Sequence, residues 1–227
     1  MSGSKFYAVR KGLVSGIYNS WEECKNNVHG FPGAEYKSFK TLEEAKAYMG
    51  DISSDTENVS VEKVDTTKTK AKKTKASQDL VEYLSSKMTS AAIAYVDGSY
   101  NVATGEYAYG MLIFHDGKLY EECKSFDDPE MSSMRNVAGE IQGAARAMAY
   151  SVENGIDSLD IYYDYAGIEK WALGEWKTNK EGTRAYKEYY VSISDKLKVH
   201  FHKVKGHSGD MGNDRADELA KSALGIE

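Results

Sequence analysis

One segment of the sequence divides the chain into two parts that must fold separately. Residues 51–78 contain no Phe, Tyr, Trp or Leu, and Lys alternates with Thr and Ala through residues 66–75. Such a segment cannot bury enough apolar surface to offset the conformational entropy that it would lose on folding. We therefore predict a flexible linker over residues 51–90, between a small unit over residues 1–50 and a larger unit over residues 91–227.

The small unit has the pattern of a compact α+β domain. Residues 5–9 and 36–39 have the composition of short strands. Two segments, Ser20–Glu23 and Thr41–Glu44, match the capping box that begins a helix. We expect a few short strands covered by two helices.

The larger unit alternates strand and helix patterns, which is typical of an α/β fold. Strands are predicted over residues 91–100, 107–114, 118–124, 159–165 and 198–204. Helices are predicted over residues 137–155, 167–176 and 182–195, with a last helix capped by Asn213. This order predicts a mixed five-stranded sheet with helices packed on it.

Composition narrows the class of protein. The chain has no apolar run long enough to span a membrane and no signal-peptide pattern at its start, so we expect no membrane partner and a cytoplasmic location. Its two cysteines, Cys24 and Cys123, lie in different units, which argues against a disulfide framework. The net charge of −6 would by itself argue against a nucleic-acid partner. However, residues 1–50 carry +2, and the acidic excess lies in residues 79–227, at −9.

Four acidic residues stand where a fold alone would not place them. Asp97 interrupts an apolar strand and Asp164 ends another, while Glu140 and Asp217 lie beside the apolar faces of two helices. Acids near a core are rare unless they are paired or bind a metal ion. Any one of them could cap an element or lie at its rim. All four together indicate a shared site.

Four motifs in order carry a family resemblance over nearly all of residues 91–227. They are Tyr-Val-Asp-Gly-Ser-Tyr at 95–100, Asn-Val-Ala-Gly-Glu-Ile at 136–141, Tyr-Tyr-Asp-Tyr at 162–165, and Lys-Gly-His-Ser-Gly at 205–209 with Asn-Asp-Arg-Ala-Asp-Glu-Leu-Ala at 213–220. This set resembles type 1 ribonuclease H. The resemblance implies a ribonuclease H-like fold and an endonuclease that cuts the RNA strand of RNA–DNA hybrids, leaving a 5′-phosphate and a 3′-hydroxyl.

The resemblance also implies a metal site. Its ligands would be the four acids already singled out, Asp97, Glu140, Asp164 and Asp217. They would hold two Mg²⁺ ions, or Mn²⁺ in their place, because hard cations prefer carboxylate oxygens. His207 would be a mobile histidine that transfers a proton or assists product release. Asp214 and Asp210 match the pattern of ligands less well.

Substrate contacts are assigned by the same resemblance. Gly98, Ser99 and Asn136 would read the 2′-hydroxyl that distinguishes RNA from DNA. Many relatives carry a basic loop after the segment that corresponds to Trp171 and Trp176. In this chain the loop, residues 177–182, is short and only mildly basic. We interpret the two tryptophans as packing residues rather than as a platform for DNA.

The small unit resembles the hybrid-binding domain that precedes many ribonuclease H domains and that also occurs in viroplasmin. The resemblance rests on residues 6–12, 16–21 and 31–39. It implies that Trp21 and Tyr36 stack on the DNA strand, with Lys37 on a phosphate and Tyr7 nearby. The implied partner is an RNA–DNA hybrid, with weaker binding of duplex RNA, and we expect a monomer.

Two other functions remain open on the sequence. One is a non-catalytic hybrid- or RNA-binding protein whose nuclease domain is degenerate, although the intact set of four acids argues against it. The other is a different nuclease or transferase of the same fold, such as an integrase, although such relatives lack the N-terminal module. Cleavage of a hybrid with Mg²⁺, compared with EDTA, separates the non-catalytic reading from the catalytic ones.

Overall fold

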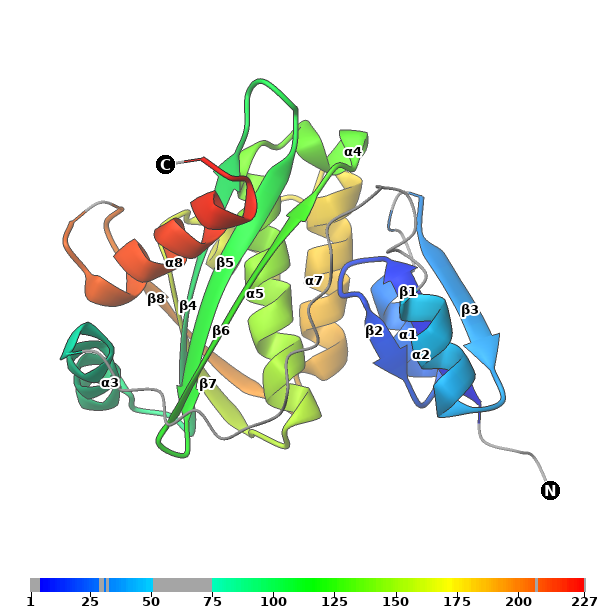
Figure 1. The fold of residues 1–227 in the computed structure, drawn as a ribbon, viewed down its shortest axis with the longest axis horizontal. Helices are drawn as coiled ribbons and strands as arrows, with labels where there is room; N and C mark the ends of the chain where they lie inside the picture. The colour runs from blue at the N-terminus through cyan, green and yellow to red at the C-terminus, as the bar shows by residue number, and fades with distance from the viewer. Residues whose placement is uncertain (1–4, 29–30, 32, 51–74, 207, 227) are drawn as a thin grey trace, which may run out of the picture.

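The fold is taken from a computed structural model, which describes residues 5–28, 31, 33–50, 75–206 and 208–226. It contains a small unit at the N-terminus and a larger α/β unit that follows it (Figure 1). Within the described ranges, no helix combines the length and the apolar character that a membrane crossing would require.

The larger unit is built on a five-stranded mixed sheet in the order β6-β5-β4-β7-β8, as the strand pattern predicted. The strands are β4 (Ala92–Tyr100), β5 (Tyr107–His115), β6 (Lys118–Phe126), β7 (Ser158–Tyr163) and β8 (Lys198–Lys203). β4, β5 and β6 pair antiparallel, whereas β4, β7 and β8 run parallel. The parallel half places the carboxyl ends of β4 and β7 side by side, where Asp97 and Asp164 lie.

Helices cover both faces of the sheet (Figure 1). Those of this unit are α3 (Lys75–Lys87), α4 (Pro129–Ser132), α5 (Asn136–Glu153), α6 (Gly167–Ala172), α7 (Glu181–Ile193) and α8 (Met211–Ala223). On β4, alternate residues face opposite sides, because side chains alternate along a strand. Ala94 and Val96 pack in the core that includes α5 and α7, while Ile93 and Tyr95 pack with α3 and α8.

Two glycines set how closely the helices approach the sheet. A Cβ atom on Gly98 would lie 2.1 Å from the Asn136 carbonyl oxygen, and one on Gly110 would lie 2.0 Å from the Ala216 carbonyl oxygen. Any larger residue would push α5 or α8 away from the strands. Both helices carry acids of the candidate site, so these close contacts control the site's dimensions.

The small unit is a three-stranded antiparallel sheet in the order β2-β1-β3 with two helices. Its elements are β1 (Phe6–Lys11), β2 (Gly16–Tyr18), α1 (Trp21–Val28), β3 (Glu35–Phe39) and α2 (Leu42–Gly50). Both predicted capping boxes are confirmed at the first-turn amides. The Glu23 amide donates to Ser20 Oγ at 3.2 Å, and the Glu44 amide donates to Thr41 Oγ1 at 3.2 Å.

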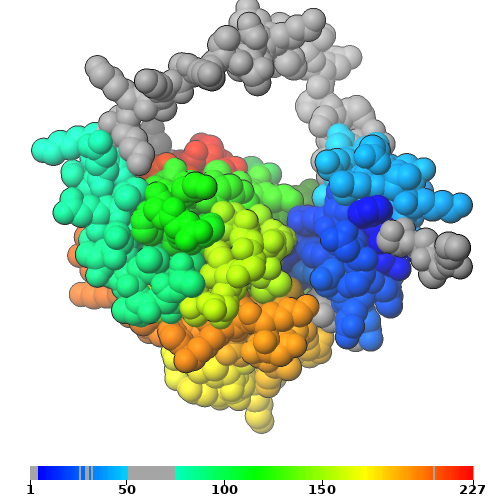
Figure 2. Space-filling model, turned by 90° about the horizontal axis from the view of Figure 1, so that it is seen from below, coloured from blue at the N-terminus to red at the C-terminus, as the bar shows by residue number. Residues whose placement is uncertain are grey.

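The small unit packs directly on the larger one, as Figure 2 shows. Leu13 and Val14, in the β1–β2 connection, are buried in the same cluster as Tyr107 and Tyr109 of the larger unit. Two polar contacts flank this cluster. Lys11 pairs with Asp128 at 3.0 Å, and Lys124 donates to Ser15 at 2.8 Å. The two units therefore share an interface, which the composition of the linker did not predict.

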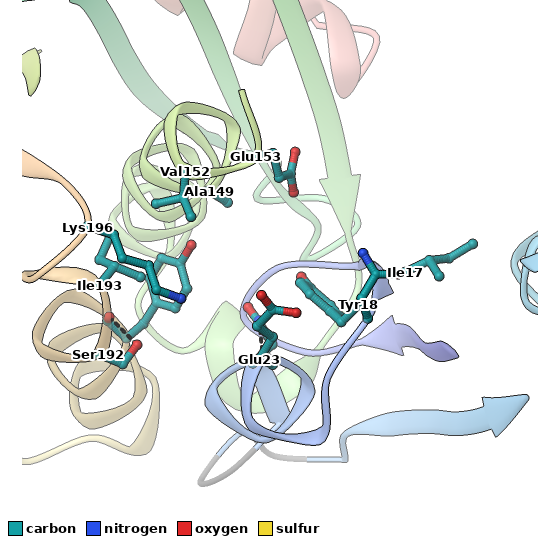
Figure 3. A pocket seen from close by; sticks show the side chains of 12 residues that line it. Ile17, Tyr18, Glu23, Ala149, Val152, Glu153, Ser192, Ile193 and Lys196 are labelled. Atoms are coloured by element: carbon teal, nitrogen blue, oxygen red, sulfur yellow. Dashed lines mark hydrogen bonds between the residues drawn. The ribbon is translucent and has the colours of Figure 1, made fainter. Parts of the chain in front are cut away.

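A cavity of about 350 Å³ remains in this interface (Figure 3). Ile17, Tyr18 and Glu23 line it from the small unit. Ala149 and Ile193 line it from α5 and α7. The packing between the units is thus close at the β1–β2 connection and incomplete beside α1.

The structure corrects two expectations. Residues 75–90 do not belong to the linker: Leu80 and Leu84 of α3 are buried on the sheet, and the Thr89 amide donates to the buried carboxylate of Asp160 at 2.6 Å. Asn213 does not cap the last helix. The cap is Asp210, which accepts hydrogen bonds from two amides of the first turn, so α8 begins at Met211.

The interface gives a direct test. We expect Leu13→Ala to lower the free energy of unfolding by about 2–4 kcal/mol, the usual cost of truncating a buried leucine. Urea unfolding followed by tryptophan fluorescence measures it. The matched control is Leu173→Ala, whose side chain is 49% exposed and whose loss should cost less than about 0.5 kcal/mol. Equal, small effects for both variants would contradict the packing of Leu13 on the larger unit.

Candidate active site

Three carboxylates from three different elements meet at the end of the sheet. Asp97 comes from β4, Glu140 from the second turn of α5, and Asp164 directly follows β7. One oxygen of each lies within 4.8 Å of the others. Asp97 and Glu140 are 8% and 1% exposed, so two of the three are almost fully removed from water.

Burial and mutual repulsion make this cluster electrostatically unfavourable. Burial, followed by the nearby charge of Asp164, raises the pKa of Asp97 to about 7. Burial also raises the pKa of Glu140 well above its ordinary value, and the charges of Asp164 and Asp97 add to the effect. The positive charge of Lys221 lowers the pKa of Asp97, but it does not offset burial and the neighbouring acids.

The donor set fits a hard divalent cation. All three donors are carboxylate oxygens, which Mg²⁺ and Mn²⁺ prefer over softer ligands. In addition, Glu140 Oε2 is buried and has no hydrogen-bond partner among the described residues. An unpaired buried carboxylate oxygen costs free energy, and a bound cation would satisfy it.

Asp217 lies near this group but outside it. Its carboxylate pairs with Lys221, one turn further along α8, at 2.8 Å. After burial and Asp164, its charge also contributes to the raised pKa of Asp97. The motif singles out Asp217 but not Lys221, although Lys221 follows it by four residues, the spacing of a helical ion pair.

Of the other residues predicted for the catalytic site, two contact the acids of the cluster. The Gly98 amide donates to Asp97 Oδ1 at 2.7 Å, which fixes the orientation of that carboxylate. Asn136 begins α5, and its side-chain amide lies 3.5 Å from Glu140 Oε1. Ser99 is buried next in the strand. His207 lies outside the described residues.

The segment that leads to α8 touches the cluster. A Cβ atom on Gly206 would lie 2.5 Å from Asp164 Oδ2. Any residue larger than glycine would therefore displace this carboxylate. The motif over residues 205–209 contains both Gly206 and the candidate histidine His207. Its glycine has a steric reason of its own.

A hollow beside Asp164 was not anticipated. Tyr165, Trp171 and Trp176 form a cluster of tilted and edge-to-face rings with centroids 5.7–6.2 Å apart. Tyr165 and Trp171 line a cavity of about 350 Å³ together with residues that include Lys177 and Lys180. The packing role predicted for Trp171 agrees with its contacts in the core, whereas Trp176 is 39% exposed.

The small unit presents a separate group of aromatic side chains. The ring of Trp21 lies 5.8 Å from that of Tyr7 and 5.8 Å from that of Tyr36. Trp21 and Tyr36 are 47% and 45% exposed, which is unusual for large apolar rings. Lys37 follows Tyr36 on β3 and is exposed. We refer to Tyr7, Trp21 and Tyr36 as the aromatic platform.

Comparisons with known proteins match both units. The profile of the RNase H family matches residues 89–225, and the profile described as the ribonuclease H1 N-terminal domain matches residues 5–49. Ribonuclease H1 of Mus musculus is 26% identical, over 95% of this chain and 88% of its own length. Ribonuclease H of Schizosaccharomyces pombe is 27% identical, over 97% and 98%. The RNase H domain of Rv2228c from Mycobacterium tuberculosis shares the fold, with a TM-score of 0.51 at 16% identity, over 60% of this chain and 95% of that one.

The raised pKa of Asp97 predicts how the site affects stability. A buried acid with a raised pKa favours the folded state at low pH, and this contribution is lost as the pH rises through about 7. We therefore expect Asp97→Asn in EDTA to be more stable than the parent protein at pH 8, by on the order of 2 kcal/mol, with the gain shrinking toward pH 5. Thermal unfolding across this pH range measures it. Asp214→Asn, an acid in the first turn of α8 that lies outside the cluster, is the control. A gain that did not change with pH would contradict the electrostatic account.

Proposed function

The chain belongs to the ribonuclease H family, and from this premise we propose that it cleaves the RNA strand of RNA–DNA hybrids endonucleolytically, leaving a 5′-phosphate and a 3′-hydroxyl. One observation carries the proposal. The carboxylates of Asp97, Glu140 and Asp164, the first two of them buried, converge at the end of the sheet, within the part of the chain that the family profile matches. Such a group has no structural use that would offset its cost.

In the proposed site, Asp97, Glu140, Asp164 and Asp217 hold two divalent cations, with Mg²⁺ the preferred ion and Mn²⁺ an alternative. When bound, the ions activate the attacking water and neutralise charge on the scissile phosphate. Glu140 would use Oε2, the oxygen that has no hydrogen-bond partner among the described residues. Asp217 would exchange its contact with Lys221 for the cation.

The chain's own residues supply orientation and recognition. The Gly98 amide holds Asp97 by a hydrogen bond, so this carboxylate does not need to reorganise. Asn136, at the start of α5, would read the 2′-hydroxyl of the RNA strand together with the backbone at Gly98 and Ser99. His207 would transfer a proton or assist product release.

The small unit would bind the same substrate at a second place. An exposed aromatic platform beside a lysine suits sequence-independent binding of a nucleic-acid strand, because rings stack on any base or sugar and lysine neutralises phosphate. We propose that residues 1–50 bind the hybrid through Tyr7, Trp21, Tyr36 and Lys37, with weaker binding of duplex RNA. The catalytic unit would extend from residue 75 rather than from residue 91, because α3 is part of its fold.

Catalysis tests the assignment of the acids. We expect Asp97→Asn and Asp217→Asn each to reduce cleavage of a hybrid in Mg²⁺ by at least about 10²–10³-fold, because each removes preorganised charge at the reacting phosphate. Asp214→Asn, whose carboxylate lies three residues before Asp217 in α8, should stay active. Single-turnover cleavage of a labelled hybrid measures all three, with EDTA as the blank. Near-normal cleavage by Asp97→Asn would refute the proposed site.

Binding tests the aromatic platform separately. In EDTA, which prevents cleavage, the full chain with Trp21→Ala and Tyr36→Ala should bind hybrid more weakly by roughly 1–3 kcal/mol for each lost ring. Fluorescence anisotropy against hybrid, duplex DNA and duplex RNA at several salt concentrations measures it. Tyr120→Ala, which removes a ring 37% exposed on β6, is the control. Unchanged hybrid affinity in the double variant would rule out this role for the platform.

A further inference from the structure

Helix α3 belongs to neither of the two matched domains, yet it is packed into the fold. The matches cover residues 5–49 and 89–225, and α3 lies between them. Leu80 and Leu84 are buried in a cluster with Ala216 of α8. Figure 1 shows α3 and α8 on the same side of the sheet. An element outside both domains therefore contacts a helix that carries an active-site acid.

The last residue of α3, Lys87, reaches into a group of aromatic rings. Its ammonium lies 4.6 Å from the centre of the Tyr83 ring and 5.3 Å from that of Tyr162. It also donates to the Tyr95 hydroxyl at 3.3 Å. Tyr95 and Tyr162 stack on each other with centroids 4.5 Å apart. Rings on several sides of an ammonium attract it and restrict its position.

The same ammonium holds Asp210 at the beginning of α8. Lys87 Nζ lies 2.8 Å from Asp210 Oδ2, and the side chain of Asp210 is only 11% exposed. The other oxygen, Oδ1, accepts from the amides of Gly212 and Asn213 at 3.1 and 3.3 Å. One carboxylate thus caps α8 with one oxygen and joins it to α3 with the other.

This link leads to the active site along α8. Asp217 lies seven residues after Asp210, which is about two helical turns. Asp217 therefore follows any movement of the N-terminal end of α8. Gly206, four residues before Asp210, lies close to the Asp164 carboxylate.

We propose that Lys87 is a positioning residue of the active site, which fixes the N-terminal end of α8 through Asp210 and thereby sets the place of the Asp217 carboxylate. Within the described part of the chain, Lys87 contacts Asp210 and the rings around it rather than the acids of the cluster, so it would act through Asp210. The inference rests on the proposed nuclease activity, because only a reaction at this site makes the position of Asp217 matter.

Two variants separate this role from its alternatives. Lys87→Met keeps an apolar side chain of similar length among the rings and removes the ammonium. Asp210→Asn keeps an oxygen that can cap α8 and removes the negative charge. Positioning predicts that both variants lower kcat in the same direction, by on the order of tenfold, since small misplacements of reacting groups are costly. A long-range charge effect would predict opposite changes, because one variant removes a positive charge and the other a negative one.

The measurements are kcat and KM for a hybrid at saturating Mg²⁺, thermal unfolding, and amide NMR shifts of α8 in the metal-free full chain. We expect kcat to fall with KM unchanged, shifts at Gly212 and Asn213 in both variants, and a double variant no worse than either single one. Lys75→Met, an exposed lysine of the same helix, should match the parent protein.

Two results would overturn the inference. One is unchanged kcat and α8 shifts in Lys87→Met and Asp210→Asn. The other is a loss of activity that only follows the unfolded fraction. If the parent protein failed to cleave hybrid at all, the proposed function would fail, and the α8 shifts would still decide whether Lys87 positions the helix.

Discussion

The carboxylates of Asp97, Glu140 and Asp164 repel one another at the end of the sheet, and the surrounding fold is what keeps them together. Two of them are almost completely buried, so water cannot screen the repulsion. Each comes from a different element, so no local structure could hold the group. The packing of α5 on β4, which is close because Gly98 has no side chain, supplies the necessary restraint. The fold thus loses some stability at this point and holds the acids in the arrangement that the proposed cation site requires.

The two faces of the sheet restrain the acids by different means. On the face of α5, Glu140 is held by an apolar core that includes Ile141 and Ala144. On the face of α8, the core is smaller, and Asp217 lies at the more exposed rim. There, charged contacts complement apolar packing: Lys221 pairs with Asp217, and Lys87 pairs with Asp210. Polar contacts are more sensitive to geometry than apolar ones, so this face is the one where a helix outside the matched domains can influence the site.

The interface between the units joins two domains that the sequence of residues 51–90 predicts to be separate. A linker of low apolar content suggests two bodies that move independently. However, Leu13 and Val14 are buried against Tyr109, and Lys11 pairs with Asp128. The aromatic platform and the carboxylate cluster therefore belong to one packed arrangement of domains. The packing is incomplete beside α1, where a cavity of about 350 Å³ separates the two units.

The five strands, the helices α5, α7 and α8 and both capping boxes could be predicted from the sequence, because each leaves a local signal of periodicity or turn chemistry. The sequence also singled out four acids beside apolar segments, of which the structure brings Asp97, Glu140 and Asp164 together. The sequence did not predict α3, because its two buried leucines, Leu80 and Leu84, are buried only by packing against the sheet. The true cap of α8 was equally hidden, since Asp210 and Asn213 are both good caps and only the path of the loop chose between them. Only the packing of distant segments brings together the acids of the cluster, and only it lets Lys87 reach Asp210 across 123 residues. Distances between residues far apart in sequence depend on how the layers pack, and no local pattern encodes them.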